Sequence, residues 1–207
     1  MSSTNDEKML WQNLHELDQQ ITLFINGFHC PAWDQIMLIF SHVKLWFPMY
    51  GIIAALLFWR LGWKKGLAAV LSCVLCVVLC DQLANLVKDS VARLRPCQNE
   101  AMIGMGLHML ETGGGLYGFW SGHASNSFGF AVCSTMGFRN DKRLKYRGYA
   151  AWIFSWAFLV SISRIFVGKH YFGDVLIGGI AGALTGLICA LLGRLAIRLF
   201  VRDKAAA

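Results

Sequence analysis

Eight residues in three separate stretches of the chain combine side chains that suit chemistry on an anion. The stretches are KDSVARLRPC, SGH and SRIFVGKHYFGDV, and they lie far apart in the sequence. Together they supply cations, imidazoles, a carboxylate, a hydroxyl and a glycine. The residues are Lys88, Arg95, Ser121, Gly122, His123, Arg164, His170 and Asp174. A fold that joins them would form one polar site.

The basic residues of this set predict an anionic ligand. Arg95 and Arg164 carry guanidinium groups that match phosphate oxygens in bidentate fashion, and Lys88 adds a point charge. Gly122 stands at the start of an expected helix, where backbone N–H groups can bind an anion. The expected ligand is a phosphate or a phosphate-like oxyanion.

The two histidines and the aspartate predict what happens to that anion. His170 and Asp174 are four residues apart, so on a helix they share a face, and the carboxylate can hold the imidazole in one tautomer. The free ring nitrogen of His170 would attack phosphorus. His123 would protonate the departing oxygen and then activate water, while Ser121 and Gly122 cradle the phosphoryl oxygens.

Each of these residues also has a simpler interpretation. A lysine or arginine at a helix end is often an anchor at the membrane interface, and a loop histidine is often solvated or hydrogen-bonded. His170 and Asp174 could instead hold a metal ion, but no third ligand stands at helical spacing. The combination predicts a phosphate site without a metal or a cofactor.

The rest of the chain has the composition of an integral membrane protein. Of its 207 residues, 56% are hydrophobic and 15% are charged, and the mean hydropathy is +0.49, well above soluble usage. The length suits a single domain over residues 1–207. The net charge is +7, but the basic residues form no single stripe with aromatic residues between them, so a nucleic-acid partner is not expected.

Apolar runs predict an all-α, polytopic membrane helical bundle of about six transmembrane helices. Five runs are clear, at residues 45–59, 66–80, 124–138, 149–163 and 175–193, and the last approaches the ~20 residues that span a bilayer. Near the N-terminus, Gly27 and Pro31 interrupt the apolar pattern. Residues 1–32 are therefore expected to form either a broken span or an interfacial helix followed by a short one.

Basic residues predict the orientation of these elements. They cluster at 60–65, at 139–147 and at 194–204, and alternation of the spans puts all three groups on one side. The positive-inside rule makes that side cytoplasmic. The three polar stretches then share the opposite face, which places the active site at the extracytoplasmic interface.

Cysteine usage leaves one question open. Cys73, Cys76 and Cys80 lie in the run LSCVLCVVLC, where they are expected to be small apolar helix residues rather than a redox or metal pair. Cys30 and Cys97 flank apolar runs and would pair only in an oxidising compartment.

The motifs K-x6-RP, SGH and SR-x5-H-x3-D resemble those of the phosphatidic acid phosphatase type 2 family, which shares its site with vanadium-dependent haloperoxidases. They cover residues 88–174. The resemblance implies a six-helix membrane phosphatase that works without a metal, through a phosphohistidine intermediate. By position it assigns phosphate binding to Lys88, Arg95, Ser121, the Gly122 backbone and Arg164. His123 would then be the general acid, His170 the nucleophile and Asp174 the partner that orients His170.

One position departs from the family pattern. The second motif usually begins with proline, and Trp120 stands in its place. Proline would stiffen the backbone, whereas tryptophan offers a bulky amphipathic ring. The contacting residues are intact, so the substitution bears on substrate fit.

The resemblance implies a bacterial lipid phosphatase of the inner (cytoplasmic) membrane, with its active site facing the periplasm or the cell exterior. The expected partners are the bilayer and a lipid phosphate. We expect undecaprenyl diphosphate as the substrate, with lipid A, phosphatidylglycerophosphate or phosphatidate as alternatives. The loop between Pro96 and Ser121 is the expected selector. Its apolar residues are expected to insert among lipids: Met102, Met105, Leu107, Met109 and Leu110.

Two other classes of protein stay open. One is an oxidative enzyme that holds vanadate in the same pocket. The expected membrane location and the small size of the chain argue against this class. The other is a non-catalytic membrane transporter or scaffold that binds phospholipid. Phosphate release from a lipid phosphate separates a phosphatase from the second class.

Overall fold

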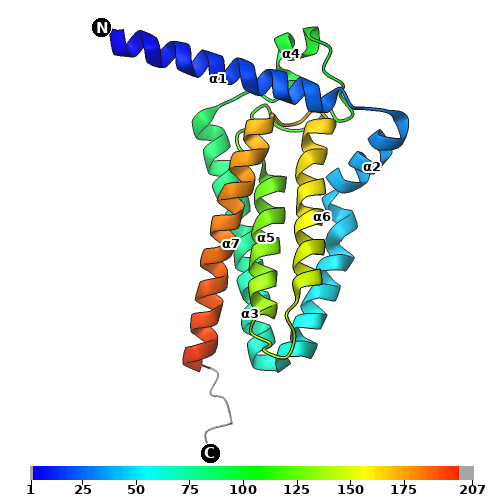
Figure 1. Cartoon of the computed structure of the whole chain (residues 1–207), viewed down its shortest axis with the longest axis vertical. Helices are drawn as coiled ribbons and strands as arrows, with labels where there is room; N and C mark the ends of the chain where they lie inside the picture. The colour runs from blue at the N-terminus through cyan, green and yellow to red at the C-terminus, as the bar shows by residue number, and fades with distance from the viewer. Residues whose placement is uncertain (1, 201–207) are drawn as a thin grey trace, which may run out of the picture.

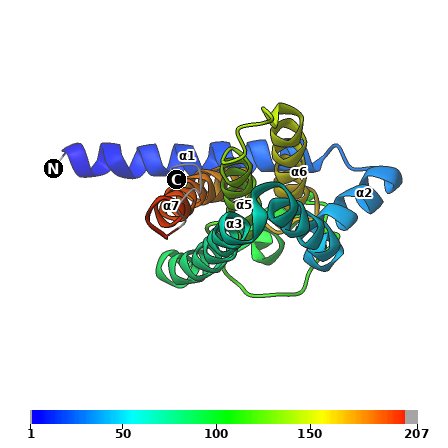
Figure 2. The same cartoon turned by 90° about the horizontal axis from the view of Figure 1, so that it is seen from below.

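The computed structural model describes residues 2–200, which form a bundle of helices without a β-sheet. The helices are α1 (Ser2–Asn26), α2 (Pro31–Ser41), α3 (Phe47–Val91), α4 (Glu100–Gly104), α5 (Gly122–Phe138), α6 (Arg147–Phe166) and α7 (Phe172–Phe200), with short 3₁₀ turns at Val43–Trp46 and Pro96–Gln98. Helices α3, α5, α6 and α7 stand side by side, and α1 lies across one end of them (Figures 1 and 2). The predicted all-α membrane bundle is confirmed.

Three helical segments of the described residues are long and apolar enough to cross a membrane: Val43–Val91, Arg147–Phe166 and Phe172–Phe200. The first consists of two arms, because Gly62 has φ 74° and ψ 172°, a backbone conformation open to little but glycine. The arms fold back tightly, since a Cβ on Gly66 would lie 2.8 Å from the Cα of Phe58. These arms carry the apolar runs 45–59 and 66–80, which the sequence predicts as separate elements.

Helix α5 occupies the centre of the bundle, between α3, α6 and α7 (Figure 2). Glycines of α7 allow close approach: a Cβ on Gly178 would lie 2.6 Å from the carbonyl oxygen of Ser121, and a Cβ on Gly182 would collide with the backbone of Ser125. Small residues four apart permit such contact between membrane helices. The contacts fix the start of α5 against the second and third turns of α7.

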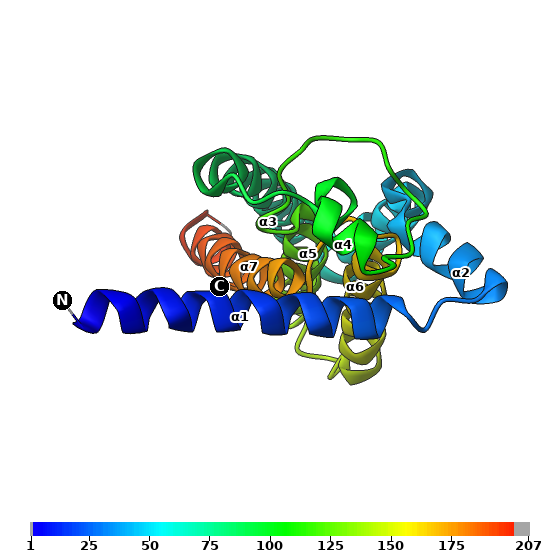
Figure 3. The ribbon, with the colours of Figure 1, turned by 90° about the horizontal axis from the view of Figure 1, so that it is seen from above.

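Helix α1 is attached to the end of the bundle where α7 begins (Figure 3). Asp18 Oδ1 accepts a hydrogen bond from the Gly173 N–H at 2.7 Å, and Thr22 Oγ1 accepts one from the Phe172 N–H at 3.0 Å. These N–H groups belong to the first turn of α7 and have no partner inside that helix. Side chains of α1 therefore complete the start of α7.

The N-terminal geometry favours the interfacial alternative for this region. Helix α1 runs unbroken to Asn26, a turn follows, and α2 starts at Pro31 and leads toward the first arm of α3. Large apolar side chains such as Trp11 and Phe24 are exposed on α1, as in helices that lie in a membrane interface. The number of membrane crossings stays a prediction.

The end of the bundle away from α1 holds the basic residues that the sequence predicts on one side of the membrane. In the loop between α5 and α6, Asp141 accepts hydrogen bonds from Arg60 at 2.7 Å and from Arg143 at 2.8 Å. The C-terminal turns of α7 lie at the same end (Figure 1). Arg202 and Lys204, also expected in this group, lie outside the described residues. The predicted grouping is present, and the side of the membrane that it faces stays a prediction.

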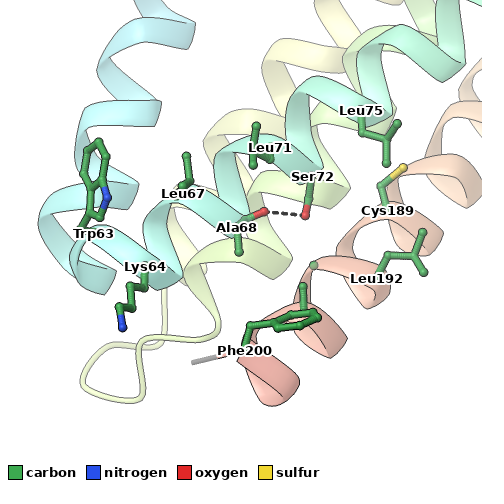
Figure 4. A pocket seen from close by; sticks show the side chains of 12 residues that line it. Trp63, Lys64, Leu67, Ala68, Leu71, Ser72, Leu75, Cys189, Leu192 and Phe200 are labelled. Atoms are coloured by element: carbon green, nitrogen blue, oxygen red, sulfur yellow. Dashed lines mark hydrogen bonds between the residues drawn. The ribbon is translucent and has the colours of Figure 1, made fainter. Parts of the chain in front are cut away.

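A groove of about 570 Å³ lies near this end, between the second arm of α3 and the end of α7 (Figure 4). Its lining is mainly apolar and includes Leu71, Leu192 and Phe200. The Ser72 hydroxyl in its wall donates to the Ala68 carbonyl of its own helix at 2.7 Å. The groove offers no cluster of groups suited to chemistry, so the functional site lies elsewhere.

Candidate active site

A cavity of about 290 Å³ brings the three predicted stretches together at the α1 end of the bundle. Its wall comes from the end of α3, the start of α5, the end of α6 and the turn before α7. The predicted residues that line it are Lys88, Arg95, Gly122, His123, Arg164 and His170. Ser121 and Asp174 are fully buried and do not form part of the wall. The convergence expected from the sequence is therefore present.

The start of α5 presents backbone rather than hydroxyl to this cavity. Ser121 is the N-cap residue: its Oγ accepts a hydrogen bond from the Ala124 N–H at 3.5 Å, and its own N–H donates to the Asp174 carbonyl at 2.9 Å. Gly122 lines the cavity, and a Cβ there would lie 3.7 Å from Lys88 Nζ. Helix N–H groups beside an ammonium group suit an anion.

Lys88 and Arg95 are positioned by neutral partners. Lys88 Nζ donates to Asn85 Oδ1 at 3.2 Å, and Asn85 Nδ2 lies 3.4 Å from Asp81 Oδ2. Arg95 Nε donates to the Tyr117 carbonyl at 3.1 Å. Since neither cation is paired directly with a carboxylate among the described residues, both charges are available to a phosphate.

Arg164 is the buried cation of the cavity, with 4% of its surface exposed. Its Nη1 donates to Ser41 Oγ, its Nη2 lies 3.4 Å from Glu111 Oε2, and its Nε has no partner. Ser41 Oγ in turn donates to Glu111 Oε1 at 2.5 Å. Neither Ser41 nor Glu111 is predicted from the sequence, yet both meet the guanidinium that is expected to bind phosphate.

The ionisation of Glu111 follows from these contacts. Burial acts to raise the pKa of its carboxyl group, but the hydrogen bond from Ser41 and the charges of Arg164 and Lys169 outweigh burial and lower that pKa. Glu111 is therefore ionised at neutral pH and balances Arg164 at the edge of the anion site.

His170 and Asp174 face each other as their spacing predicts. The Nδ1 of His170 lies 3.5 Å from Asp174 Oδ2 and has no closer partner, which leaves Nε2 for the cavity. Asp174 is the third residue of α7, and its Oδ2 accepts a hydrogen bond from the Tyr171 N–H at 3.0 Å, as in a capping box. Such catalytic contacts are often long in the free enzyme and tighten with substrate.

Burial keeps His170 uncharged. Its side chain is 3% exposed, and burial lowers the pKa of its imidazole to about 4, against the opposing effect of Asp174. The charges of Arg164 and Arg95 act in the same direction as burial. At neutral pH the ring is therefore unprotonated, which is the state that can attack phosphorus.

His123 is oriented by a backbone carbonyl. Its Nε2 lies 3.2 Å from the carbonyl oxygen of Ser41, and because a carbonyl only accepts, Nε2 is the protonated nitrogen of that pair. In the neutral ring Nδ1 is therefore the acceptor, which can take a proton from water. It can give a proton to a leaving oxygen only in the imidazolium form. Burial and the charge of Arg164 disfavour that form by lowering the pKa of His123, whereas the negative charge of a bound phosphate would favour it.

Arg93 and Asp18 form a second layer of contacts behind His170, and neither is predicted from the sequence to belong to the site. Arg93 Nη1 donates to Asp174 Oδ1 at 2.7 Å, and its Nη2 donates to Asp18 Oδ2 at 2.6 Å. The guanidinium also lies 3.8 Å from the centre of the Tyr171 ring. A chain of polar contacts thus runs from α1 through Arg93 and Asp174 to His170.

Arg93→Ala should lower kcat by on the order of 10²-fold with a smaller change in KM, because Asp174 loses the group that fixes it while the phosphate-binding cations remain. An Asp174 carboxylate without Arg93 stabilises the protonated imidazole more. The pKa of His170 should rise, and the acid limb of kcat/KM should move to higher pH. Initial rates across pH, corrected for ionisation of the substrate, measure both effects.

Arg60→Ala is the matched control for that variant, since it removes an arginine–carboxylate contact of 2.7 Å at the other end of the bundle. It should leave kcat and the pH profile unchanged. An equal loss in both variants would show that Arg93 acts on stability alone.

The loop before Ser121 differs in part from its prediction. Met102 and Leu107 are buried at 0% and 6% exposure and pack with Tyr171, so the expectation that they dip among lipids is wrong, because they form a small core under the loop. Met105 is 51% exposed and stays available to lipid. Lys169 contacts this loop by donating a hydrogen bond to the Gly113 carbonyl.

The cysteines carry no crosslink among the described residues. Cys30 and Cys97 are separate thiols, the first exposed and the second buried. Cys73, Cys76 and Cys80 are buried in the bundle core, as expected for small apolar helix residues.

The arrangement can move a phosphoryl group from an ester to an imidazole. Cations and helix N–H groups offset the charge on the phosphate oxygens, His170 supplies a lone pair, and His123 supplies a proton. Because the cavity lies at the end of membrane-spanning helices, its substrate presents a phosphate at the membrane surface. The fold and the site define an integral membrane lipid phosphatase.

Comparison with known proteins supports this class of protein. The chain belongs to the PAP2 superfamily, whose family model matches residues 65–198. The family expected from the three motifs is thereby confirmed, as is lipid phosphatase activity.

Two relatives share a substrate in their names. The lipid A 4'-phosphatase of Bacteroides thetaiotaomicron is 36% identical over 175 residues, covering 84% of this chain and 75% of the relative. The lipid A 4'-phosphatase of Porphyromonas gingivalis is 31% identical over 172 residues, covering 83% and 70%.

Two solved structures share the fold. The PAP2-type phosphatidylglycerolphosphate phosphatase of Bacillus subtilis superposes with a TM-score of 0.70 at 20% identity, covering 90% of this chain and 89% of that one. Aquifex aeolicus LpxE superposes with a TM-score of 0.61 at 23% identity, covering 82% and 92%. At these identities the likeness concerns the helical frame.

Proposed function

We propose that this chain is a lipid A phosphatase that hydrolyses the 4'-phosphate ester. The observation that carries the proposal is the 36% identity to a lipid A 4'-phosphatase over 84% of this chain. The sequence alone favours undecaprenyl diphosphate and keeps lipid A as an alternative. The relatives support the alternative.

The leaving group also fits a sugar phosphate monoester. When Nε2 of His170 bonds to phosphorus, the P–O bond to the sugar breaks and its electron pair stays on the sugar oxygen. That alkoxide is a poor leaving group unless it receives a proton, which the doubly protonated imidazolium form of His123 supplies from Nδ1, leaving a neutral ring. A diphosphate instead releases a phosphate, which needs far less help from an acid.

Water completes the reaction in a second step. His123, now neutral, takes a proton from water as the water oxygen bonds to phosphorus. The P–N bond breaks, its electron pair returns to Nε2 of His170, and inorganic phosphate leaves. Lys88, Arg95 and the N–H groups at the start of α5 stabilise the phosphoryl oxygens in both steps, as does Arg164.

The wall residues suit an anion better than a metal ion. Three cations line the cavity, against one carboxylate, that of Asp81. Hydrolysis without a metal therefore stays part of the proposal. The basic residues at the opposite end of the bundle support a cavity that faces the periplasm from the inner membrane.

Purified enzyme in detergent should release phosphate from lipid A with a higher kcat/KM than from undecaprenyl diphosphate, phosphatidylglycerophosphate or phosphatidate, because its site matches a sugar monoester. Phosphate release measures the rates, and mass spectrometry of the lipid product should show loss of the 4'-phosphate. His170→Ala is the background control. A higher kcat/KM on undecaprenyl diphosphate, or removal of a different phosphate of lipid A, would contradict the proposed substrate.

A further inference from the structure

A second cluster of ligating side chains lies outside the phosphate cavity, and we propose that it binds a divalent transition-metal ion of the zinc class. Its members are His29, Asp34 and His108, whose ligating atoms, one from each residue, lie within 4.8 Å of one another. Two imidazoles and a carboxylate, with a fourth position left to water, form a known zinc ligand set. None of the three lines the phosphate cavity, so the metal-free expectation for phosphate chemistry is unaffected.

The contacts within this cluster leave one carboxylate oxygen without a partner. His108 Nε2 lies 3.0 Å from Asp34 Oδ2, but Asp34 Oδ1 is buried and has no hydrogen bond. The ring of His29 stacks on that of His108 with centroids 3.9 Å apart and planes at 12°. A buried oxygen without a partner costs free energy, and a bound cation removes that cost. The contact between His108 Nε2 and Asp34 Oδ2 does not remove that cost, because it leaves Oδ1 without a partner.

The fold holds His108 in place through Asn26, which is 1% exposed. Asn26 Nδ2 donates to the His108 carbonyl at 2.9 Å, and the His108 N–H donates to Asn26 Oδ1 at 2.8 Å. Asn26 Nδ2 also lies 3.0 Å from the Ile165 carbonyl at the end of α6. The cluster therefore has a rigid support.

Three chain segments meet at this cluster. His29 follows α1, Asp34 lies in the first turn of α2, and His108 belongs to the loop after α4. A bound ion would join them, and the loop it fixes carries Glu111, which contacts Arg164 in the phosphate cavity. His29 is exposed, so an ion can reach the cluster from water. Two imidazole ligands favour zinc and its transition-metal neighbours over magnesium or calcium.

Calorimetric titration with zinc chloride tests this site directly. The full chain is purified in detergent without a polyhistidine tag and is stripped with a chelator beforehand. Wild type should bind one zinc ion per chain, and magnesium chloride should give no heat. His29→Ala and Asp34→Asn should weaken zinc binding by at least about tenfold. His42→Ala removes another exposed histidine and should bind zinc like wild type.

Hydrogen exchange gives a second readout that does not depend on catalysis. Zinc should slow exchange in the loop around His108 in wild type and in His42→Ala, but not in His29→Ala. Zinc binding of equal strength in wild type, His29→Ala and Asp34→Asn would overturn the proposal. So would the absence of zinc binding by wild type.

Discussion

His170→Ala should reduce phosphate release from lipid phosphates by about 10⁶-fold, the scale seen when a covalent nucleophile is removed. The imidazole is buried, unprotonated at neutral pH and backed by Asp174. The other histidine that lines the described cavity, His123, has no such carboxylate and is held by the Ser41 carbonyl. Phosphate release by wild type and variant, at equal protein concentration in detergent, measures the loss.

The controls for this variant separate chemistry from folding. His42→Ala removes an exposed histidine and should keep full activity. The thermal midpoint of His170→Ala should show that it stays folded. Turnover of the folded variant at a rate close to that of wild type would refute the nucleophile assignment.

Arg164→Ala should lower kcat/KM by about 10²–10³-fold, as for the loss of one preorganised donor to a developing anion. Its guanidinium is buried and has a free Nε, so no water-exposed side chain can take over its position. Arg164→Lys keeps the charge but loses the planar fork, and it should recover part of the activity at most. Steady-state kinetics on the preferred lipid phosphate measure both variants.

Glu111→Gln tests the role of Arg164 from the other partner of the contact. It removes the carboxylate that balances Arg164 while keeping a similar shape, so it should lower KM for the anionic substrate. Wild-type kinetics in folded Arg164→Ala, together with no change in Glu111→Gln, would contradict a phosphate contact at Arg164.

The residues that line the candidate site could be predicted from the sequence because their types are unusual where they stand. Cations and histidines beside apolar runs, such as Arg164 and His170, need a partner or a ligand, and alternation of the spans places them on one face. The apolar runs 45–59 and 66–80 predict the two arms of α3 as separate elements. The glycine conformation at Gly62 is the local reason for the fold-back.

The supporting residues could not be predicted because their roles depend on which distant segments touch. Asp18 lies in an amphipathic helix, where a carboxylate is ordinary, and only the position of α1 across the bundle brings it to Arg93. Glu111 has one signal in the sequence, as an acidic residue in the glycine-rich loop that joins the first two polar stretches. The burial of Met102 was not predicted because an apolar loop residue can equally face lipid or a small core.

Orthovanadate bound to the purified enzyme tests the central claim most directly, since vanadate adopts the five-coordinate geometry of a phosphoryl group in transfer. An experimental structure of that complex should show vanadium bonded to Nε2 of His170. Its oxygens should contact Lys88, Arg95, Arg164 and the N–H groups at the start of α5. Vanadate attached to His123, or bound outside this cavity, would contradict the account.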